Sequence, residues 1–172
     1  MQQVLEYRIE DLVGREFHGF FQRSPELVLE SRRYREKLKV DHPDLISQYD
    51  EFHGSLDLQD AAIDRKYDFY MKVLEFDPKS GLFIAKGNDV LGVSGLVGEV
   101  KGREIEFTKT YVGPKSPDVL LGRFRTIQYL GEISKVGYEL RLIGTYIPGK
   151  GITNYSGIWH LISLLDSKET KD

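Results

Sequence analysis

Residues 81–111 read GLFIAKGNDVLGVSGLVGEVKGREIEFTKTY, and this stretch decides the fold class. Glycines repeatedly interrupt its short apolar runs, and it ends in the strictly alternating run Ile105–Tyr111. Alternation of apolar and polar residues is typical of a strand with one buried face and one wet face. Gly87-Asn88-Asp89 and Lys101-Gly102 are predicted as turns between such strands, because Gly and Asn tolerate positive φ. The stretch therefore predicts an antiparallel β meander.

The same pattern continues on both sides of this stretch. Strands are predicted at 52–58, 66–76, 82–86, 91–100, 103–112, 123–134, 138–147 and 156–165. No helical pattern separates them, and parallel strands need long crossover connections, so the sheet should be antiparallel. Eight short antiparallel strands commonly close on themselves, which removes exposed edges. The prediction is a mainly β protein with an eight-stranded antiparallel up-and-down barrel, and a two-layer sandwich is the alternative.

The N-terminal third is predicted to hold about three α-helices. Apolar residues recur at helical spacing in residues 3–13, 25–39 and 41–52, and Ser24-Pro25 has the chemistry of an N-cap followed by a first-turn proline. The predicted organisation is a helical segment over residues 1–51 packed on a barrel domain over residues 52–166. The charged residues 167–172 are predicted to be a disordered tail.

Composition excludes several classes of partner. The 172 residues carry a net charge of -3, so the basic excess that phosphate-backbone binding requires is missing and no nucleic-acid partner is expected. The absence of cysteine excludes disulfides and thiolate catalysis and fits a reducing compartment. The N-terminus does not have the pattern of a signal peptide, and no apolar run is long enough to span a membrane. A cytoplasmic location is therefore expected.

Several short motifs resemble those of calycin-like barrels. The run Gly87–Gly95 is similar to the G-x-D-x-x-G pattern of these domains, and Phe107-x-Lys109-x-Tyr111 is similar to their F-x-K-x-Y strand. Tyr129-Leu130-Gly131 matches a Y-x-G strand, and Ile143–Tyr146 or Gly157–Trp159 matches the late I-x-G-x-W strand. The resemblance covers residues 52–165, although the early G-x-W element of lipocalins is absent. Lipocalins, fatty-acid-binding proteins and avidins bind small apolar molecules inside the barrel, so the resemblance implies such a ligand here.

Lys109 is the candidate polar anchor for a ligand. Its alternation partners Ile105, Phe107 and Tyr111 are apolar or aromatic, so the lysine should point into the barrel, where an unpaired ammonium is costly. It could meet a ligand carboxylate with help from tyrosine hydroxyls, or instead reach the barrel rim or pair with Glu75 or Glu99. The predicted ligand-binding residues of the barrel interior are Lys109, Tyr111, Tyr129, Tyr67, Phe107 and Trp159.

No pattern of residues predicts catalysis, a metal site or a cofactor. Nucleophile-elbow, P-loop and dinucleotide-binding motifs are missing, and the histidines have no H-x-H or H-x-x-x-H spacing. His160 could ligate haem, but alternation places it opposite Trp159 on the last strand, and no haem is predicted.

Two functions remain open from the sequence. The first is non-covalent binding of a small apolar or amphipathic molecule in the barrel interior. The second is a protein-interaction or scaffold module with a solid barrel and a partner that binds the helix at 25–39. A cavity well above ~300 Å³ at Lys109 would favour the first, whereas an interior filled by Met71, Phe107, Tyr129 and Trp159 would favour the second. The oligomeric state is not predicted.

Overall fold

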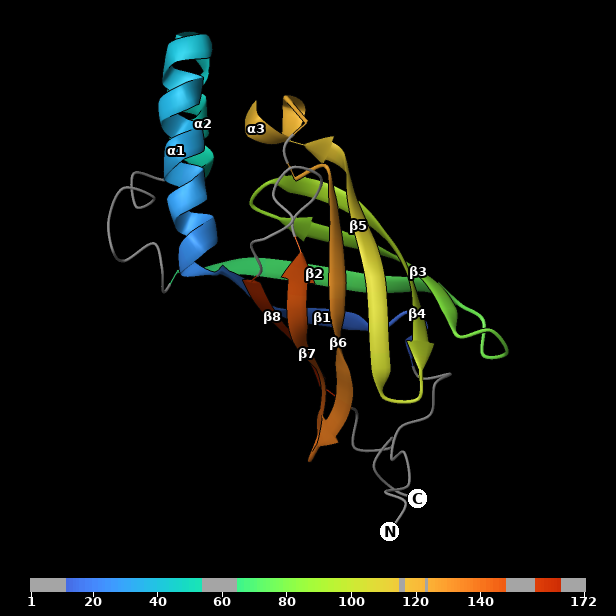
Figure 1. Cartoon of the computed structure of the whole chain (residues 1–172). Helices are drawn as coiled ribbons and strands as arrows, with labels where there is room; N and C mark the ends of the chain where they lie inside the picture. Colours follow the sequence, from blue (N-terminus) through green and yellow to red (C-terminus); the bar gives the residue numbers. More distant parts are fainter. Residues whose placement is uncertain (1–11, 54–64, 115–116, 123, 148–156, 165–172) are drawn as a thin grey trace.

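The fold is a closed, eight-stranded antiparallel barrel. The computed structural model describes residues 12–53, 65–114, 117–122, 124–147 and 157–164 (Figure 1). Each strand pairs with its neighbour in sequence, and the first strand pairs with the last, which closes the barrel. The strands are β1 (Glu16–Arg23), β2 (Lys66–Phe76), β3 (Leu82–Asp89), β4 (Gly92–Lys101), β5 (Glu104–Pro114), β6 (Thr126–Val136), β7 (Glu139–Ile147) and β8 (Gly157–Leu164). The predicted mainly β, antiparallel, closed architecture is confirmed.

The first strand lies at a different place in the chain from the one that the sequence predicted. β1 occupies Glu16–Arg23, within the segment that was assigned to helices, whereas Phe52 and His53 end a helix and residues 54–58 lie outside the described residues. Its inward positions are Phe17, Gly19, Phe21 and Arg23, so a glycine and a charged residue break the apolar alternation. Gly19 is needed for closure, since a Cβ there would lie 1.8 Å from the carbonyl oxygen of His160 on β8.

The helices follow β1 rather than precede the barrel. The segment between β1 and β2 holds two α-helices, α1 (Pro25–Asp41) and α2 (Ile46–His53), joined by the 3-10 turn η2 (Pro43–Leu45). Ser24 is the N-cap of α1, since its side chain accepts a hydrogen bond from the backbone N–H of Leu27, as the sequence predicted. About three N-terminal helices were expected, but the described N-terminal residues hold these two, and the short helix α3 (Pro117–Leu120) follows β5. The predicted helix at 3–13 lies almost wholly outside the described residues, as does the predicted tail.

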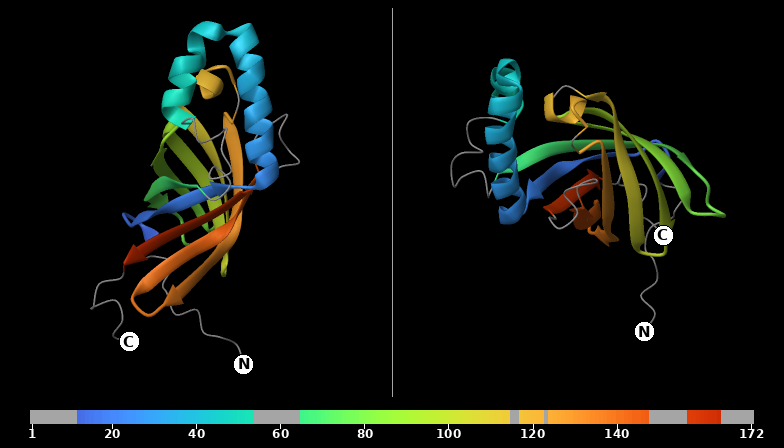
Figure 2. Two further views of the ribbon diagram at one scale, coloured as in Figure 1. Left: turned by 90° about the vertical axis from the view of Figure 1, so that its left-hand side faces the viewer. Right: turned by 45° about the horizontal axis from the view of Figure 1, so that its top comes forward.

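The two helices form a hairpin at one end of the barrel (Figure 2). The Arg35 guanidinium on α1 donates two hydrogen bonds to the Asp50 carboxylate on α2, over 2.8 Å and 2.7 Å. Tyr49 is fully buried between them, with its ring 6.1 Å from that of Tyr34. Hydrogen bonding to Asp50 raises the pKa of Arg35. The described helices include none that is long and apolar enough to cross a membrane.

The centre of the barrel is filled by aromatic side chains. The rings of Phe107 and Tyr129 stack with centroids 4.7 Å apart, and Trp159 meets both rings edge-on at 5.4 Å and 5.8 Å. The indole N–H of Trp159 donates to the carbonyl oxygen of Thr145 at 3.0 Å. Gly131 leaves room for this indole, because a Cβ at that position would lie 2.7 Å from the Trp159 ring. Side-chain packing therefore fills the centre of the barrel.

Candidate functional site

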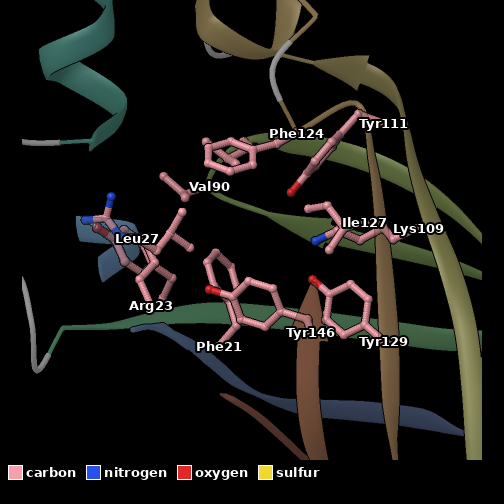
Figure 3. A pocket seen from close by; sticks show the side chains of 12 residues that line it. Phe21, Arg23, Leu27, Val90, Lys109, Tyr111, Phe124, Ile127, Tyr129 and Tyr146 are labelled. Carbon is pink, nitrogen blue, oxygen red and sulfur yellow. Dashed lines mark hydrogen bonds between the residues drawn. The ribbon is translucent and has the colours of Figure 1, made fainter. Parts of the chain in front are cut away.

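A small cavity lies at the end of the barrel that carries the helical hairpin (Figure 3). Its volume is about 30 Å³, which is room for about two water molecules and far below the ~300 Å³ of an ordinary ligand pocket. Two cationic and four tyrosine side chains share its lining with apolar ones. The lining residues are Phe21, Arg23, Leu27, Tyr67, Val90, Leu91, Lys109, Tyr111, Phe124, Ile127, Tyr129 and Tyr146.

Lys109 points into the barrel, as the sequence predicted, and its side chain is completely buried. Its Nζ atom lies 2.5 Å from the Oδ2 atom of Asp89, whose side chain is also completely buried. The Tyr111 hydroxyl donates to the same oxygen at 2.7 Å. The predicted pairing of Lys109 with Glu75 or Glu99 is wrong, because Glu75 is exposed and Glu99 pairs with Lys101.

Asp89 reaches the interior because β3 is longer than predicted. Gly87-Asn88-Asp89 were expected to form a turn, but they continue the strand, and Val90 and Leu91 make the turn instead. The inward face of β3 therefore runs from Phe83 to Asp89. The second carboxylate oxygen, Oδ1, accepts a hydrogen bond from the backbone N–H of Leu91 at 2.8 Å, so Asp89 supports both the turn and the buried ion pair.

The ion pair is held in an aromatic environment. Nζ of Lys109 lies 4.6 Å from the ring centroid of Phe69, 4.8 Å from that of Tyr111 and 5.3 Å from that of Tyr129. Burial by itself lowers the pKa of Lys109, but the charge of Asp89 and the neighbouring Tyr111 oppose it, so that the pKa is raised. Lys109 is therefore an ammonium at neutral pH rather than a neutral amine.

The buried tyrosines are hydrogen-bond donors at neutral pH. Burial raises the pKa of Tyr111, Tyr129 and Tyr146 well above the ordinary value of a phenol, so all three keep their protons. Tyr111 donates to Asp89, and Tyr146 donates to the carbonyl oxygen of Gln22 at 3.3 Å. The hydroxyl of Tyr129 points toward the cavity and has no hydrogen bond to any residue that the structure describes (Figure 3).

Arg23 is a second buried cation at the cavity. It is 6% exposed, and its guanidinium donates a hydrogen bond to the Tyr67 hydroxyl over 2.5 Å. The guanidinium also lies 5.0 Å from the centroid of the Tyr67 ring, and Arg65 lies at 4.8 Å from the same centroid. Two of the residues that line the cavity are thus cations, Arg23 and Lys109, and the carboxylate of Asp89 pairs with Lys109.

The predicted site residues fall into two groups. Lys109, Tyr111, Tyr129 and Tyr67 line the cavity, whereas Phe107 and Trp159 do not line it and belong to the filled centre. Sequence reasoning missed Arg23, because the strand that carries it was not recognised, and it gave Asp89 only a turn role. Tyr146 could have been found, since it alternates with Leu140 and Leu142 on the inward face of β7.

In the described ranges, no group of three or more histidine, aspartate or glutamate side chains is placed to hold a metal ion. The chain matches no protein-family model, no curated protein and no solved structure. The strand pairing and the element order assign the protein to the closed eight-stranded antiparallel barrels, with a helical hairpin inserted between β1 and β2. This architecture is compatible with a calycin-like fold, and membership of that family stays a prediction.

Proposed function

We propose that the helical end of the barrel binds a small amphipathic molecule with one negative charge, non-covalently. The observation that carries this proposal is the Tyr129 hydroxyl. Tyr129 is 1% exposed, and its hydroxyl faces the cavity without a partner among the described residues. The hydroxyl oxygen is not one of the completely buried polar atoms that lack a partner, so it is accessible from the cavity and can donate to an acceptor on a ligand or to a water molecule.

The charge of the ligand follows from the groups around the cavity. The lining contains the cationic side chains Arg23 and Lys109 and four tyrosine hydroxyls, so it offers a ligand mainly hydrogen-bond donors. Because Asp89 already pairs with Lys109, the lysine is a shared rather than an exclusive anchor for an anion. The tyrosine hydroxyls are protonated donors, so a carboxylate suits the site better than an ammonium.

The packing of the barrel sets the orientation of the ligand. Phe107, Met71 and Trp159 block the central part of the barrel, so an apolar chain has no space beyond Tyr129. Leu27, Val90, Phe124 and Ile127 provide apolar surface on the side of the hairpin. The polar end of the ligand should therefore lie inward and its apolar end toward the helices.

A ligand larger than two water molecules requires side chains to move. Phe124 is the clearest candidate, since its φ of 55° lies in the left-handed region that non-glycine residues adopt rarely. Such a backbone conformation costs about 1–3 kcal/mol, which would be released if the backbone of Phe124 changed together with its ring on binding. Displacement of the Phe124 ring would widen the cavity where it meets α1 and the turn between β3 and β4.

The test uses the single tryptophan as a local reporter. The Trp159 ring lies 5.8 Å from that of Tyr129, so its fluorescence should respond to a ligand at this hydroxyl. Titration with octanoate, 1-octanol and octylammonium should give the tightest binding for octanoate. Tyr129→Phe should weaken octanoate binding about 2–10-fold, since one hydrogen bond contributes about 0.5–1.5 kcal/mol.

Tyr138→Phe is the matched control, because Tyr138 is 63% exposed on the turn between β6 and β7. It should leave octanoate binding unchanged. Equal affinity for the three probes, or equal effects of the two Tyr→Phe variants, would refute the proposal. Native mass spectrometry of protein purified from cells should also show a retained small molecule, which denaturation releases.

The second candidate is a protein-interaction module, which the filled centre and the small cavity favour. Arg33, Lys37 and Lys39 on α1 are exposed, whereas Arg35 is engaged by Asp50. A protein partner with an acidic surface would bind this helix. If octanoate does not bind and no molecule is retained, reversal of the charges of Arg33, Lys37 and Lys39 tests this second function in a pull-down from cell extract.

A further inference from the structure

The outer face of strands β3 and β4 carries an exposed apolar patch. Ile84 and Val97 are cross-strand partners and are 44% and 61% exposed, and Leu82, two residues before Ile84, is 53% exposed. Leu82, Ile84 and Val97 are called the β3–β4 patch below. Directly opposite side chains in antiparallel strands lie about 4.5–5.5 Å apart, so these residues form one continuous surface.

Charged doublets of opposite sign flank this patch at opposite corners. Glu99 on β4 and Glu106 on β5 are direct cross-strand partners on one side. On the other side, Lys72 on β2 and Lys86 on β3 are direct cross-strand partners. Within each doublet the like charges destabilise the isolated chain, because directly opposed like charges repel each other.

The charges in these doublets are only partly compensated within the chain. Lys101 lies 3.4 Å from Glu99, and Lys72 lies 4.0 Å from Glu16. Lys86 and Glu106 form no ion pair with any residue that the structure describes. An external surface that presents the opposite sign to both doublets would relieve the repulsion in each.

We propose that the β3–β4 patch is the contact between two copies of this chain. Ile84 and Val97 lie between the doublets, and each charged residue on β3 or β4 is two positions along its strand from the patch. Consider a two-fold axis that lies in the contact plane and runs diagonally across β3 and β4 between Ile84 and Val97. Rotation about this axis places the lysine doublet of one copy over the glutamate doublet of the other, and the reverse. The second copy thereby places its lysines on the glutamates of the first.

The same axis places the apolar pair Ile84 and Val97 of one copy on the same pair of the other copy. Ile84 and Val97 lie next to the axis, so each copy presents these two side chains to the same pair of its partner. Gly95 pairs with Lys86 and has open space where a side chain would be, which leaves the lysine free to reach across. The contact is isologous, the commonest arrangement in homodimers.

The experiment measures the oligomeric state by sedimentation equilibrium over a wide range of protein concentration. The wild-type chain should dimerise, and Val97→Lys should weaken the association about tenfold or more, because like charges then face each other across the contact. Ile143→Lys is the matched control, since Ile143 is 47% exposed on the outer face of β7, outside the patch, and should leave the association unchanged.

Charge reversal tests the symmetry. The chain with Lys72→Glu and Lys86→Glu should be monomeric, and so should the chain with Glu99→Lys and Glu106→Lys. A chain that carries all four substitutions should dimerise again, because the two-fold contact then pairs the same charges with their positions exchanged. Circular dichroism confirms that each variant is folded. A wild-type monomer at every concentration, a dimer that Ile143→Lys disrupts, or failure of the fourfold reversal to restore association would overturn the proposal.

Discussion

Replacement of Asp89 by asparagine removes the only carboxylate that is hydrogen-bonded to Lys109 among the described residues. The asparagine carbonyl oxygen can still accept the hydrogen bond from the backbone N–H of Leu91, so the turn between β3 and β4 is preserved. The substitution leaves the ammonium of Lys109 in the barrel interior without a countercharge. We expect Asp89→Asn to destabilise the folded protein strongly at neutral pH.

The magnitude follows from the burial of both partners. The side chains of Lys109 and Asp89 are 0% exposed, and removal of one partner from such a pair costs about 3–5 kcal/mol. The rings of Phe69, Tyr111 and Tyr129 stabilise the remaining cation by about 0.5–2 kcal/mol. The expected loss is therefore at the lower end, about 3 kcal/mol.

The assay is equilibrium unfolding in urea, with Asp77→Asn as the matched control. Asp77 also accepts a backbone hydrogen bond within a turn, from Lys79, but it is exposed and has no buried partner, so its replacement should change stability little. The double variant Asp89→Asn with Lys109→Met should be more stable than Asp89→Asn alone, because the unpaired charge is gone.

Two results would refute this reasoning. If Asp89→Asn costs no more than Asp77→Asn, the buried pair does not depend on the Asp89 charge. If the double variant is less stable than Asp89→Asn, the ammonium stabilises the barrel by contacts other than its pairing with Asp89.

Three further predictions concern the barrel and the hairpin. The pKa of Lys109, Tyr111, Tyr129 and Tyr146 is raised in the folded state, so the folded chain holds more protons than the unfolded chain above pH ~10. The contribution of these four groups to the free energy of unfolding should therefore be constant below pH ~10 and should decrease as the pH rises further. Tyr111→Phe should make that decrease smaller, as measured by urea unfolding at a series of pH values. Ser94 has a buried hydroxyl without a partner in the described structure, so Ser94→Ala should leave stability unchanged or increase it by about 1 kcal/mol. Gly87→Ala should instead destabilise the protein by about 1–3 kcal/mol, because its Cβ would lie 2.7 Å from the Ser94 hydroxyl. Thermal unfolding measures both effects. Arg35→Ala removes two hydrogen bonds to Asp50 and should speed amide exchange in α2 while leaving β3–β5 unchanged.

The sequence predicted seven of the strands at nearly the right positions, because their apolar alternation is regular. It missed β1, where Gly19 and Arg23 occupy inward positions and hide the alternation. It also ended β3 too early, since Gly87, Asn88 and Asp89 have the chemistry of a turn. In both cases long-range pairing with neighbouring strands overrode local preference, as is common in sheets.

The sequence by itself determined the antiparallel, mainly β architecture and the inward direction of Lys109, since both follow from a two-residue period along single strands. Only the tertiary structure decided which carboxylate pairs with Lys109, because β4 separates Asp89 on β3 from Lys109 on β5. It also decided that Tyr129 faces a cavity of about 30 Å³ while Phe107 and Trp159 fill the centre. Closure of the barrel brings side chains from many strands into one volume, and how completely they fill that volume depends on all of them together.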